Sequence, residues 1–340
     1  MDYADQQKIR NQEKVNELKT ELPECFGDFL DYLSDNRSYS SRSVLNYATD
    51  LSVFTCYLHT KFGAEQEITP AFLDTLTPDD IDKYISWLNC YTKDGRQHVN
   101  GERGKARKLS SLRSMYRYLM TKKGGKTNPA KLTDLPKQHR RNVVALEQEE
   151  IGDLLEGVRT GSALTESQQK YAEKSRYRDV AIITLLLHTG IRVSELVGID
   201  LKDIDLKHGQ IRVMRKGGNE DRIYINESVE AALTDYMRLE RENGPYEANA
   251  LFISRKGERL SVRSVERIVK KYAVGSVPLK KISPHKLRSS FATVLYKQTG
   301  DINLVKDSLN HANLATVNRY VQSSDKSKQK AAKIMQETIE

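Results

Sequence analysis

The sequence lacks the features of several large classes of protein. Its 340 residues contain no apolar run close to the ~20 residues of a membrane-spanning helix, and residues 1–20 are too charged for a signal peptide. The three cysteines, Cys25, Cys56 and Cys90, form no C-x-x-C pair and cannot all be bridged by disulfides. We therefore expect reduced thiols in a cytoplasmic globular protein with no membrane partner.

Motifs for metal ions and nucleotides are also absent from the sequence. There is no H-E-x-x-H, no Cys and His spacing typical of a metal site, and no apolar strand that ends in paired carboxylates. There is also no G-x-x-x-x-G-K-[ST] loop. These absences disfavour a metal-dependent nuclease, a DDE-type transposase and a P-loop ATPase, and we expect no metal and no cofactor.

The sequence does contain a concentration of positive charge. The whole chain carries a net charge of +9. Residues 101–141 alone hold thirteen Lys or Arg against two acidic residues, an excess larger than that of the entire chain. Because like charges repel, such crowding favours a polyanionic partner, and nucleic acid is the leading candidate. The alternative is a basic linker with no partner.

The chain length predicts two domains, and the first of them has a helical pattern. Apolar residues recur at helical spacing, and Thr77 followed by Pro78 marks a helix start. A further helix is expected over residues 106–120. It would bury an apolar face and show arginines between small hydroxyl side chains on the other, as a DNA-facing helix or an ordinary solvated face would.

A basic stretch with several Gly and Pro residues predicts a linker near residues 137–142. Beyond it, residues 179–190 are apolar on nearly every face, which indicates a central buried helix that stops at Gly190. Residues 209–225 hold two β-prone runs around a Gly-Gly-Asn turn, which predicts a hairpin. Further helices are expected around Val262–Tyr272, Lys286–Lys297 and Val305–Leu309.

Cationic side chains in the second half are the strongest sign of chemistry. Arg192 directly follows the buried helix in TGIRVSEL, and Glu195 stands three residues further on. The pair is either a plain salt bridge or a guanidinium held rigidly and directed at a phosphate, whose oxygens its planar fork can bind in pairs. In SPHKLRSSFAT, His285 and Arg288 lie one helical turn apart, flanking a buried side.

The stretch LNHANLATVNRY, residues 309–320, adds His311 and Tyr320. If these side chains converge with the arginines, they form a metal-free site for a phosphodiester in which Tyr320 is the nucleophile. A phenol with a pKa near ~10 is both a workable nucleophile and a workable leaving group, so its phosphoester is reversible. Lys216, in the hairpin turn, would protonate the departing 5′-oxygen. The alternative is a surface helix that ends in a half-buried Tyr.

Three of these motifs together resemble the signature boxes of the tyrosine recombinases, the phage-integrase and Xer-type site-specific DNA recombinases. The boxes are HTGIRVSEL, HKLRSSFAT and LNHANLATVNRY, and NPAKLTDLPK resembles the family's domain junction. The likeness covers most of residues 24–325. The sequence departs from the family at Asn310, where Gly is common, and at Ser289, where His is common. Neither change removes a catalytic group.

The resemblance implies a role for each site residue. Tyr320 is the nucleophile, Arg192 and Arg288 are phosphate clamps, Lys216 is the general acid with Arg215 as the adjacent alternative, His285 assists proton transfer, His311 hydrogen-bonds a phosphate oxygen, and Glu195 supports Arg192. Contacts with DNA are expected from Arg107, Lys108, Arg113, Arg117, Lys137, Arg140 and Arg141. The implied fold has two domains: an all-α N-terminal DNA-binding domain of the SAM-like core-binding type, and a mixed α/β, mainly helical catalytic domain with a small antiparallel sheet.

We place an N-terminal extension of unknown role at 1–22, the core-binding domain at 23–136, the linker at 137–144, the catalytic domain at 145–325 and a tail helix at 326–340. The resemblance implies a monomer or weak dimer when free. On two duplex DNA sites, a homo-tetramer would exchange strands through a 3′-phosphotyrosyl intermediate and a Holliday junction, with a tail able to dock on a neighbour. The alternatives are a type IB topoisomerase-like enzyme and a non-catalytic architectural DNA-binding protein.

Overall fold

The computed structural model describes residues 3–134, 144–215, 219–241 and 249–310. The chain forms two compact units, which divide between Arg140 and Arg141. The expected linker at 137–144 therefore lies almost entirely outside the described residues, as does the expected tail helix. Within the described ranges, no helix has the length and apolar character needed to cross a bilayer.

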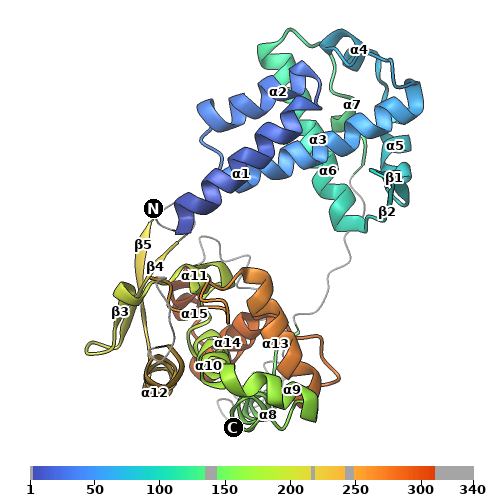
Figure 1. The fold of residues 1–340 in the computed structure, drawn as a ribbon. Helices are drawn as coiled ribbons and strands as arrows, with labels where there is room; N and C mark the ends of the chain where they lie inside the picture. The colour runs from blue at the N-terminus through green and yellow to red at the C-terminus, as the bar shows by residue number, and fades with distance from the viewer. Residues whose placement is uncertain (1–2, 135–143, 216–218, 242–248, 311–340) are drawn as a thin grey trace, which may run out of the picture. The chain divides into compact units, whose positions relative to one another are not determined.

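The first unit is mainly helical, as predicted (Figure 1). Its elements are α1 (Tyr3–Thr20), α2 (Glu24–Asp31), the π-helical turn η1 (Tyr32–Asn36), α3 (Ser41–Phe62), α4 (Pro70–Thr75), α5 (Pro78–Trp87), β1 (Tyr91–Lys93), β2 (Arg96–His98), α6 (Glu102–Lys122) and α7 (Pro129–Leu132). Thr77 caps α5 through a reciprocal capping box with Asp80, which confirms the predicted helix start.

The antiparallel hairpin β1–β2 was not predicted, because the first unit was expected to be all-α. Asp94 and Gly95 close the hairpin with φ angles of 52° and 69°. Both values are positive, as the central residues of a two-residue hairpin turn require. The Asp-Gly dipeptide was the local signal for this turn, and its strands are only three residues long each.

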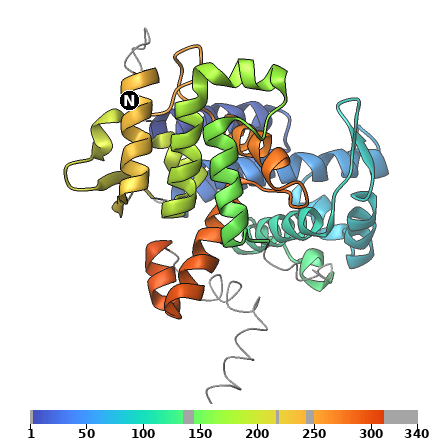
Figure 2. The same ribbon diagram turned by 90° about the horizontal axis from the view of Figure 1, so that it is seen from below.

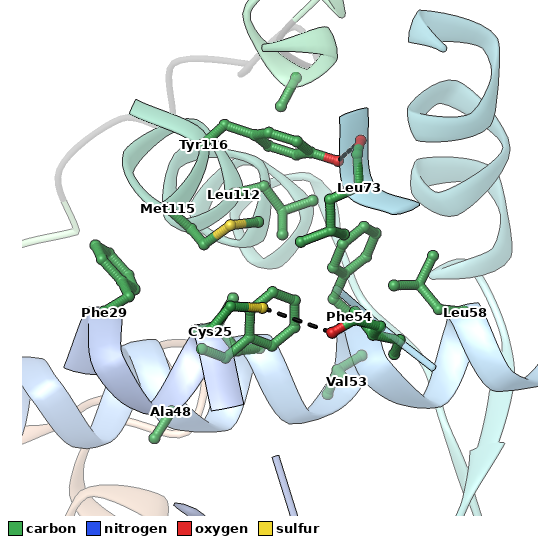
Figure 3. Close-up of a cluster of buried hydrophobic side chains, with 14 of the residues drawn as sticks. Cys25, Phe29, Ala48, Val53, Phe54, Leu58, Leu73, Leu112, Met115 and Tyr116 are labelled. Carbon is green, nitrogen blue, oxygen red and sulfur yellow. Dashed lines mark hydrogen bonds between the residues drawn. The ribbon is translucent and has the colours of Figure 1, made fainter. Parts of the chain in front are cut away.

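The core of the first unit lies between α2, α3, α4, α5 and α6. The apolar residues of α6 predicted to be buried are all at most 2% exposed: Leu109, Leu112, Met115, Tyr116 and Leu119. Figure 3 shows Met115 and Tyr116 with side chains of the other helices, among them Cys25 and Phe54. Burial raises the pKa of Cys25 to about 11, so this side chain is a neutral thiol inside the core.

Helix α1 belongs to this same core, although residues 1–22 were expected to form an extension of unknown role. Val15 is only 2% exposed and joins the buried cluster, against which Leu18 and Leu22 also pack. The helix lies along α3 (Figure 1). The apolar residues of α1 are few and widely spaced, so its sequence pattern contains little sign that the helix packs on the core.

The second unit is a helical layer with a small sheet at one edge. Its elements are α8 (Gln148–Thr160), α9 (Glu166–Ala172), η2 (Glu173–Ser175), α10 (Arg176–Thr189), α11 (Val193–Gly198), η3 (Leu201–Asp203), β3 (Ile204–Asp205), β4 (Gln210–Met214), β5 (Glu220–Tyr224), α12 (Glu227–Tyr236), η4 (Met237–Arg241), α13 (Val262–Ser276), α14 (Pro284–Thr299) and α15 (Ile302–Ser308). The sheet is antiparallel in the order β3-β4-β5, with Met214 opposite Glu220, so the predicted hairpin is confirmed.

Helix α10 is the central element of this unit, as its continuous apolar pattern predicted. Ile182, Ile183, Leu185 and Leu186 are fully buried. Helices α8, α12, α13 and α14 pack around α10 (Figure 1, Figure 2). The helix ends at Gly190, which has the left-handed φ of 61° expected of a C-terminal glycine. Ile191 after it is still buried, and Arg192 is the first residue beyond α10 to reach the candidate site.

Candidate active site

The site is built around the backbone of Gly190. Its positive φ alone favours glycine, and its surroundings exclude any side chain. A Cβ placed there would lie 2.5 Å from Cδ1 of Phe291 on α14 and 2.9 Å from Cδ2 of Leu309, which follows α15. The end of α10 therefore lies directly against α14 and the residue that follows α15, and this contact places the signature boxes beside one another.

Arg288 links the same three segments by hydrogen bonds. It projects from α14 and is only 3% exposed. Its guanidinium donates one hydrogen bond to the carbonyl oxygen of Gly190 and another, of 2.6 Å, to the carbonyl oxygen of Leu309. The sequence placed Arg288 at the flank of the buried side of α14, but the residue lies inside. His285, one turn earlier on α14, is exposed.

Arg192 caps the start of α11 together with Glu195. One guanidinium nitrogen, Nη1, donates to Oε1 of Glu195 at 2.8 Å, and the backbone N–H of Arg192 donates to Oε2 at 3.0 Å. The carboxylate is 3% exposed, whereas the Arg192 side chain is 36% exposed. The sequence suggested either a plain salt bridge or a rigidly held guanidinium. The structure combines the two, because the buried Glu195 carboxylate holds the partly exposed guanidinium of Arg192.

A second arginine binds the same carboxylate. Arg215, which directly follows β4, donates from Nη1 to Oε2 of Glu195 at 2.7 Å, and from Nε to Oδ2 of Asp221 on β5 at 2.9 Å. Its side chain is 7% exposed. A guanidinium does not lose its proton in proteins, and this one is bound to two carboxylates. Arg215 is therefore poorly suited to be the general acid, the role it was given as the alternative to Lys216.

Two residues of this cluster were missed in the sequence. Asp221 accepts a hydrogen bond of 3.0 Å from the side-chain amide of Asn310. Burial acts to raise the pKa of Asp221, but hydrogen bonds from Asn310 and Arg215 outweigh it and leave the pKa below its ordinary value. Asn310 has a φ of 46°, a conformation that Asn adopts more readily than most residues. An acidic side chain near the start of the second hairpin strand, close to the basic turn, was the signal available for Asp221.

The remaining catalytic candidates lie outside the described residues. They are Lys216, His311 and Tyr320. In the sequence, Lys216 directly follows Arg215 and His311 directly follows Asn310. The described residues therefore bring together Arg192, Glu195, Arg288 and the two residues that precede Lys216 and His311.

The candidate DNA-binding residues of α6 divide into two groups. Arg107 and Arg117 are exposed, as expected for a face that contacts DNA. Lys108 is 4% exposed, and its ammonium lies 3.2 Å from Oδ1 of Asp50, itself 1% exposed. Arg107 and the hydroxyl of Ser111 bind the same carboxylate, at 2.6 Å and 2.8 Å. Lys108 was assigned to DNA binding, but in the structure it neutralises a buried acid.

Arg113 is also engaged within the protein. It is half-buried, and its guanidinium donates to the backbone carbonyl oxygens of Ala130 at 2.8 Å and Thr133 at 2.6 Å. These contacts fix the residues around α7 against α6 and restrict Arg113 as a phosphate ligand. The other three candidates, Lys137, Arg140 and Arg141, lie outside the described residues, so their assignment stays a prediction.

Comparisons with known proteins agree with the geometry. Residues 146–327 match the model of the phage integrase family, and residues 26–123 match the phage integrase N-terminal SAM-like domain. The chain belongs to the phage integrase family. Its curated relatives include tyrosine recombinase XerC of Caldanaerobacter subterraneus subsp. tengcongensis, 33% identical over 314 residues, which cover 89% of this chain and 84% of the relative. XerC of Pelobacter propionicus is 30% identical over 298 residues, or 86% and 88% of the two chains.

Solved structures show the same fold at lower identity. XerH recombinase bound to its palindromic difH substrate in a post-cleavage complex gives a TM-score of 0.69 at 22% identity, covering 88% of this chain and 82% of that chain. A lambda integrase tetramer bound to a Holliday junction gives 0.63 at 17% identity, covering 87% and 76%. The predicted two-domain fold is thus confirmed. As a family member the protein is a site-specific DNA recombinase that cleaves and rejoins DNA. The comparisons therefore favour the predicted recombinase function over the topoisomerase-like and architectural alternatives.

Proposed function

We propose that this recombinase cleaves DNA with Tyr320 and stabilises the reacting phosphate with Arg192 and Arg288. The phenol oxygen of Tyr320 attacks the scissile phosphorus, the bond to the 5′-oxygen breaks, and a 3′-phosphotyrosyl bond remains. Lys216 gives the departing 5′-oxygen a proton, and His285 assists the transfer of the phenol proton. A 5′-hydroxyl of the exchange partner then attacks the phosphotyrosine and reverses these steps.

The arrangement of the two arginines is the observation that carries this proposal. Attack on phosphorus places additional negative charge on the non-bridging oxygens, and charge donors that are already in place stabilise this charge without reorganisation. Arg288 is fixed by two backbone carbonyl oxygens, and Arg192 is fixed by a buried carboxylate. Both cations are thus set in the folded protein before DNA binds, which supports a clamp on one phosphate.

Hydrogen-bond donation by His311 completes the proposed phosphate site. His311 follows Asn310, whose carbonyl oxygen lies 3.5 Å from Nη2 of Arg192. The chain therefore enters the third box next to the first arginine, which supports a role for His311 at the same phosphate. Glu195 acts through Arg192 and is a positioning residue in this scheme.

We further propose that the enzyme works on duplex DNA in the cytoplasm as a tetramer on two sites and is a monomer or weak dimer when free. The lambda integrase tetramer on a Holliday junction, to which this chain is similar in fold, supports the assembled state. The exposed arginines of α6 would supply part of the affinity for the DNA backbone. The tail at 326–340 would dock on the neighbouring protomer and decide which protomers cleave.

Covalent trapping on a suicide substrate tests the central assignment. A nick near the cleavage point lets the 5′-fragment diffuse away, so the phosphotyrosyl adduct accumulates and is resolved by denaturing gel. We expect Tyr320→Phe to bind the site with unchanged affinity and form no adduct, because only the phenol oxygen is removed. Tyr296→Phe, on α14, is the matched control and should form the adduct at the wild-type rate. An adduct that persists in Tyr320→Phe would assign the nucleophile to another residue.

A further inference from the structure

Arg192 and four other residues of the second unit form a closed ring of contacts. Nη1 of Arg192 binds Oε1 of Glu195 at 2.8 Å, and Oε2 of Glu195 binds Nη1 of Arg215 at 2.7 Å. Nε of Arg215 binds Oδ2 of Asp221 at 2.9 Å, and the same oxygen accepts from the Asn310 amide at 3.0 Å. The carbonyl oxygen of Asn310 lies 3.5 Å from Nη2 of Arg192, which closes the ring.

The ring joins four separate segments of the chain. Arg192 caps α11 and Glu195 lies in its first turn, Arg215 directly follows β4, Asp221 lies on β5, and Asn310 follows α15. Its two inner members are almost fully buried, with side-chain exposures of 3% for Glu195 and 7% for Arg215. Asp221 is 37% exposed. The geometry thus connects the guanidinium of Arg192 to the hairpin through the buried side chains of Glu195 and Arg215, and to the third box through the more exposed Asp221 and Asn310.

Arg192 and Arg215 share the Glu195 carboxylate, and this sharing sets the orientation of the Arg192 guanidinium. A carboxylate and a guanidinium prefer a bidentate pair with two parallel hydrogen bonds. In this site Oε2 accepts from Nη1 of Arg215 and from the backbone N–H of Arg192, so the side chain of Arg192 is bound through Oε1 alone. Without Arg215, Arg192 would be drawn into a full bidentate pair with Glu195. That pair would both turn Arg192 away and neutralise more of its charge.

We propose that Arg215, Asp221 and Asn310 are positioning residues that hold the Arg192 guanidinium in the orientation that clamps the scissile phosphate. Arg215 prevents the bidentate pair, Asp221 fixes the Arg215 fork, and Asn310 binds Asp221 through its amide while its carbonyl oxygen borders Arg192. The inference rests on the proposed function of Arg192 as a clamp. None of the three residues contacts the phosphate in this scheme.

The role of Asn310 explains how the chain departs from the pattern Leu-Gly-His. Glycine would adopt the positive φ at this position without strain, but it has no amide to bind Asp221. Asn310 supplies the conformation and the extra hydrogen bond together. Asn310→Gly therefore removes the bond and leaves the backbone carbonyl oxygen and the chain direction in place.

The test compares cleavage of two DNA substrates under single-turnover conditions. One carries the ordinary scissile phosphate. The other carries a methylphosphonate, in which a methyl group replaces one charged non-bridging oxygen, so that a cation at this phosphate matters less. The variants are Arg215→Met, Asp221→Ala and Asn310→Gly, with Arg192→Ala as reference. A shift of about 1 Å in a catalytic group costs on the order of 10²-fold in rate.

We expect Arg215→Met and Asp221→Ala to lower the cleavage rate of the ordinary phosphate by roughly 10- to 100-fold, and Asn310→Gly by a smaller factor. On the neutral substrate the ratio of wild-type to variant cleavage rate should approach one for these variants. The same is expected for Arg192→Ala. DNA affinity should stay unchanged. The matched control is Arg212→Ala on β4, since Arg212 also bridges two carboxylates, Asp203 and Glu220, outside the ring.

Three results would overturn the inference. Equal losses on the two substrates would show that the ring acts on something other than phosphate charge. Wild-type rates in Asp221→Ala and Asn310→Gly, whose altered side chains are the more exposed, would show that the ring is not needed. If Arg192→Ala lowered the cleavage rate as much on the neutral substrate as on the ordinary one, Arg192 would not act on the charge of the phosphate, and the premise of the inference would fail. Failure of the proposed function itself looks different, because an adduct would then persist in Tyr320→Phe, or wild type would form no adduct on either substrate.

Discussion

Replacement of Gly190 by alanine tests whether the junction of the signature boxes is as tightly packed as the structure indicates. Two separate costs are expected. An alanine at a φ of 61° occupies the left-handed region, at a cost of about 1–2 kcal/mol. Its Cβ would also approach the Phe291 ring to 2.5 Å and the Leu309 side chain to 2.9 Å. Overpacking of this kind costs about 1–3 kcal/mol.

The two costs together predict a loss of about 2–5 kcal/mol in the free energy of unfolding of the second unit. Gly300→Ala is the control that separates them. Gly300 ends α14 with a φ of 67°, and no heavy atom lies within 4 Å of the position of its Cβ. This control should therefore lose only the conformational part, about 1–2 kcal/mol.

Cleavage should fall more than stability alone explains. The carbonyl oxygen of Gly190 accepts a hydrogen bond from Arg288, and Phe291 lies one turn from Arg288 on α14. Displacing the Phe291 ring moves the helix that carries the second clamp. We expect adduct formation by Gly190→Ala to drop on the order of 10²-fold at a temperature where the protein is still folded, and that of Gly300→Ala to stay near wild type.

Hydrogen exchange on the full chain measures the two units separately. Peptides from α10 and α14 should lose protection in Gly190→Ala, and peptides from α3 and α6 should not. The single tryptophan, Trp87, lies in the first unit, so urea unfolding followed by its fluorescence provides an internal reference. If Gly190→Ala were as stable and as active as Gly300→Ala, the side chains of Phe291 and Leu309 could move aside for the added Cβ without cost. The tight packing of the junction would then be refuted.

Three further predictions concern the first unit and the chemistry. Arg117→Ala should reduce the log–log salt slope of DNA binding by about one unit; an unchanged slope would mean that this exposed side chain contacts no phosphate. Lys108→Ala should leave that slope unchanged but lower the stability of the first unit by about 1–3 kcal/mol, read from Trp87 fluorescence, since Asp50 loses one buried partner and keeps Arg107 and Ser111. EDTA should leave adduct formation intact in wild type, and loss of cleavage that magnesium restores would contradict the proposed mechanism.

Features of the second unit that depend on near neighbours in the chain were predicted correctly. The apolar run of α10, the stop at Gly190 and the β4–β5 hairpin all follow from patterns within about 20 residues. Each has a local cause: continuous burial, a left-handed glycine and a Gly-rich turn. The same holds for the start of α5 at Thr77, where cap and first turn are adjacent in the sequence.

Several features that depend on distant parts of the chain were not predicted correctly. Charge patterning on α6 could not distinguish Arg117, which is exposed, from Lys108, which is buried with Asp50, 58 residues earlier. The ring around Arg192 joins residues up to 118 positions apart. Periodicity reports which side of a helix is polar, but it does not report whether an acid from another helix lies opposite.

The ion pairs of the ring are desolvated when the protein folds and not when it binds DNA. Taking Glu195 and Arg215 out of water costs free energy, which their mutual attraction offsets only when the geometry is good. This cost is met when the protein folds, so it does not recur when DNA binds. The orientation of Arg192 is then independent of substrate, as preorganised stabilisation requires. A variant that loosens the ring should therefore lose cleavage before it loses DNA affinity, because non-specific contacts with the backbone do not depend on Arg192.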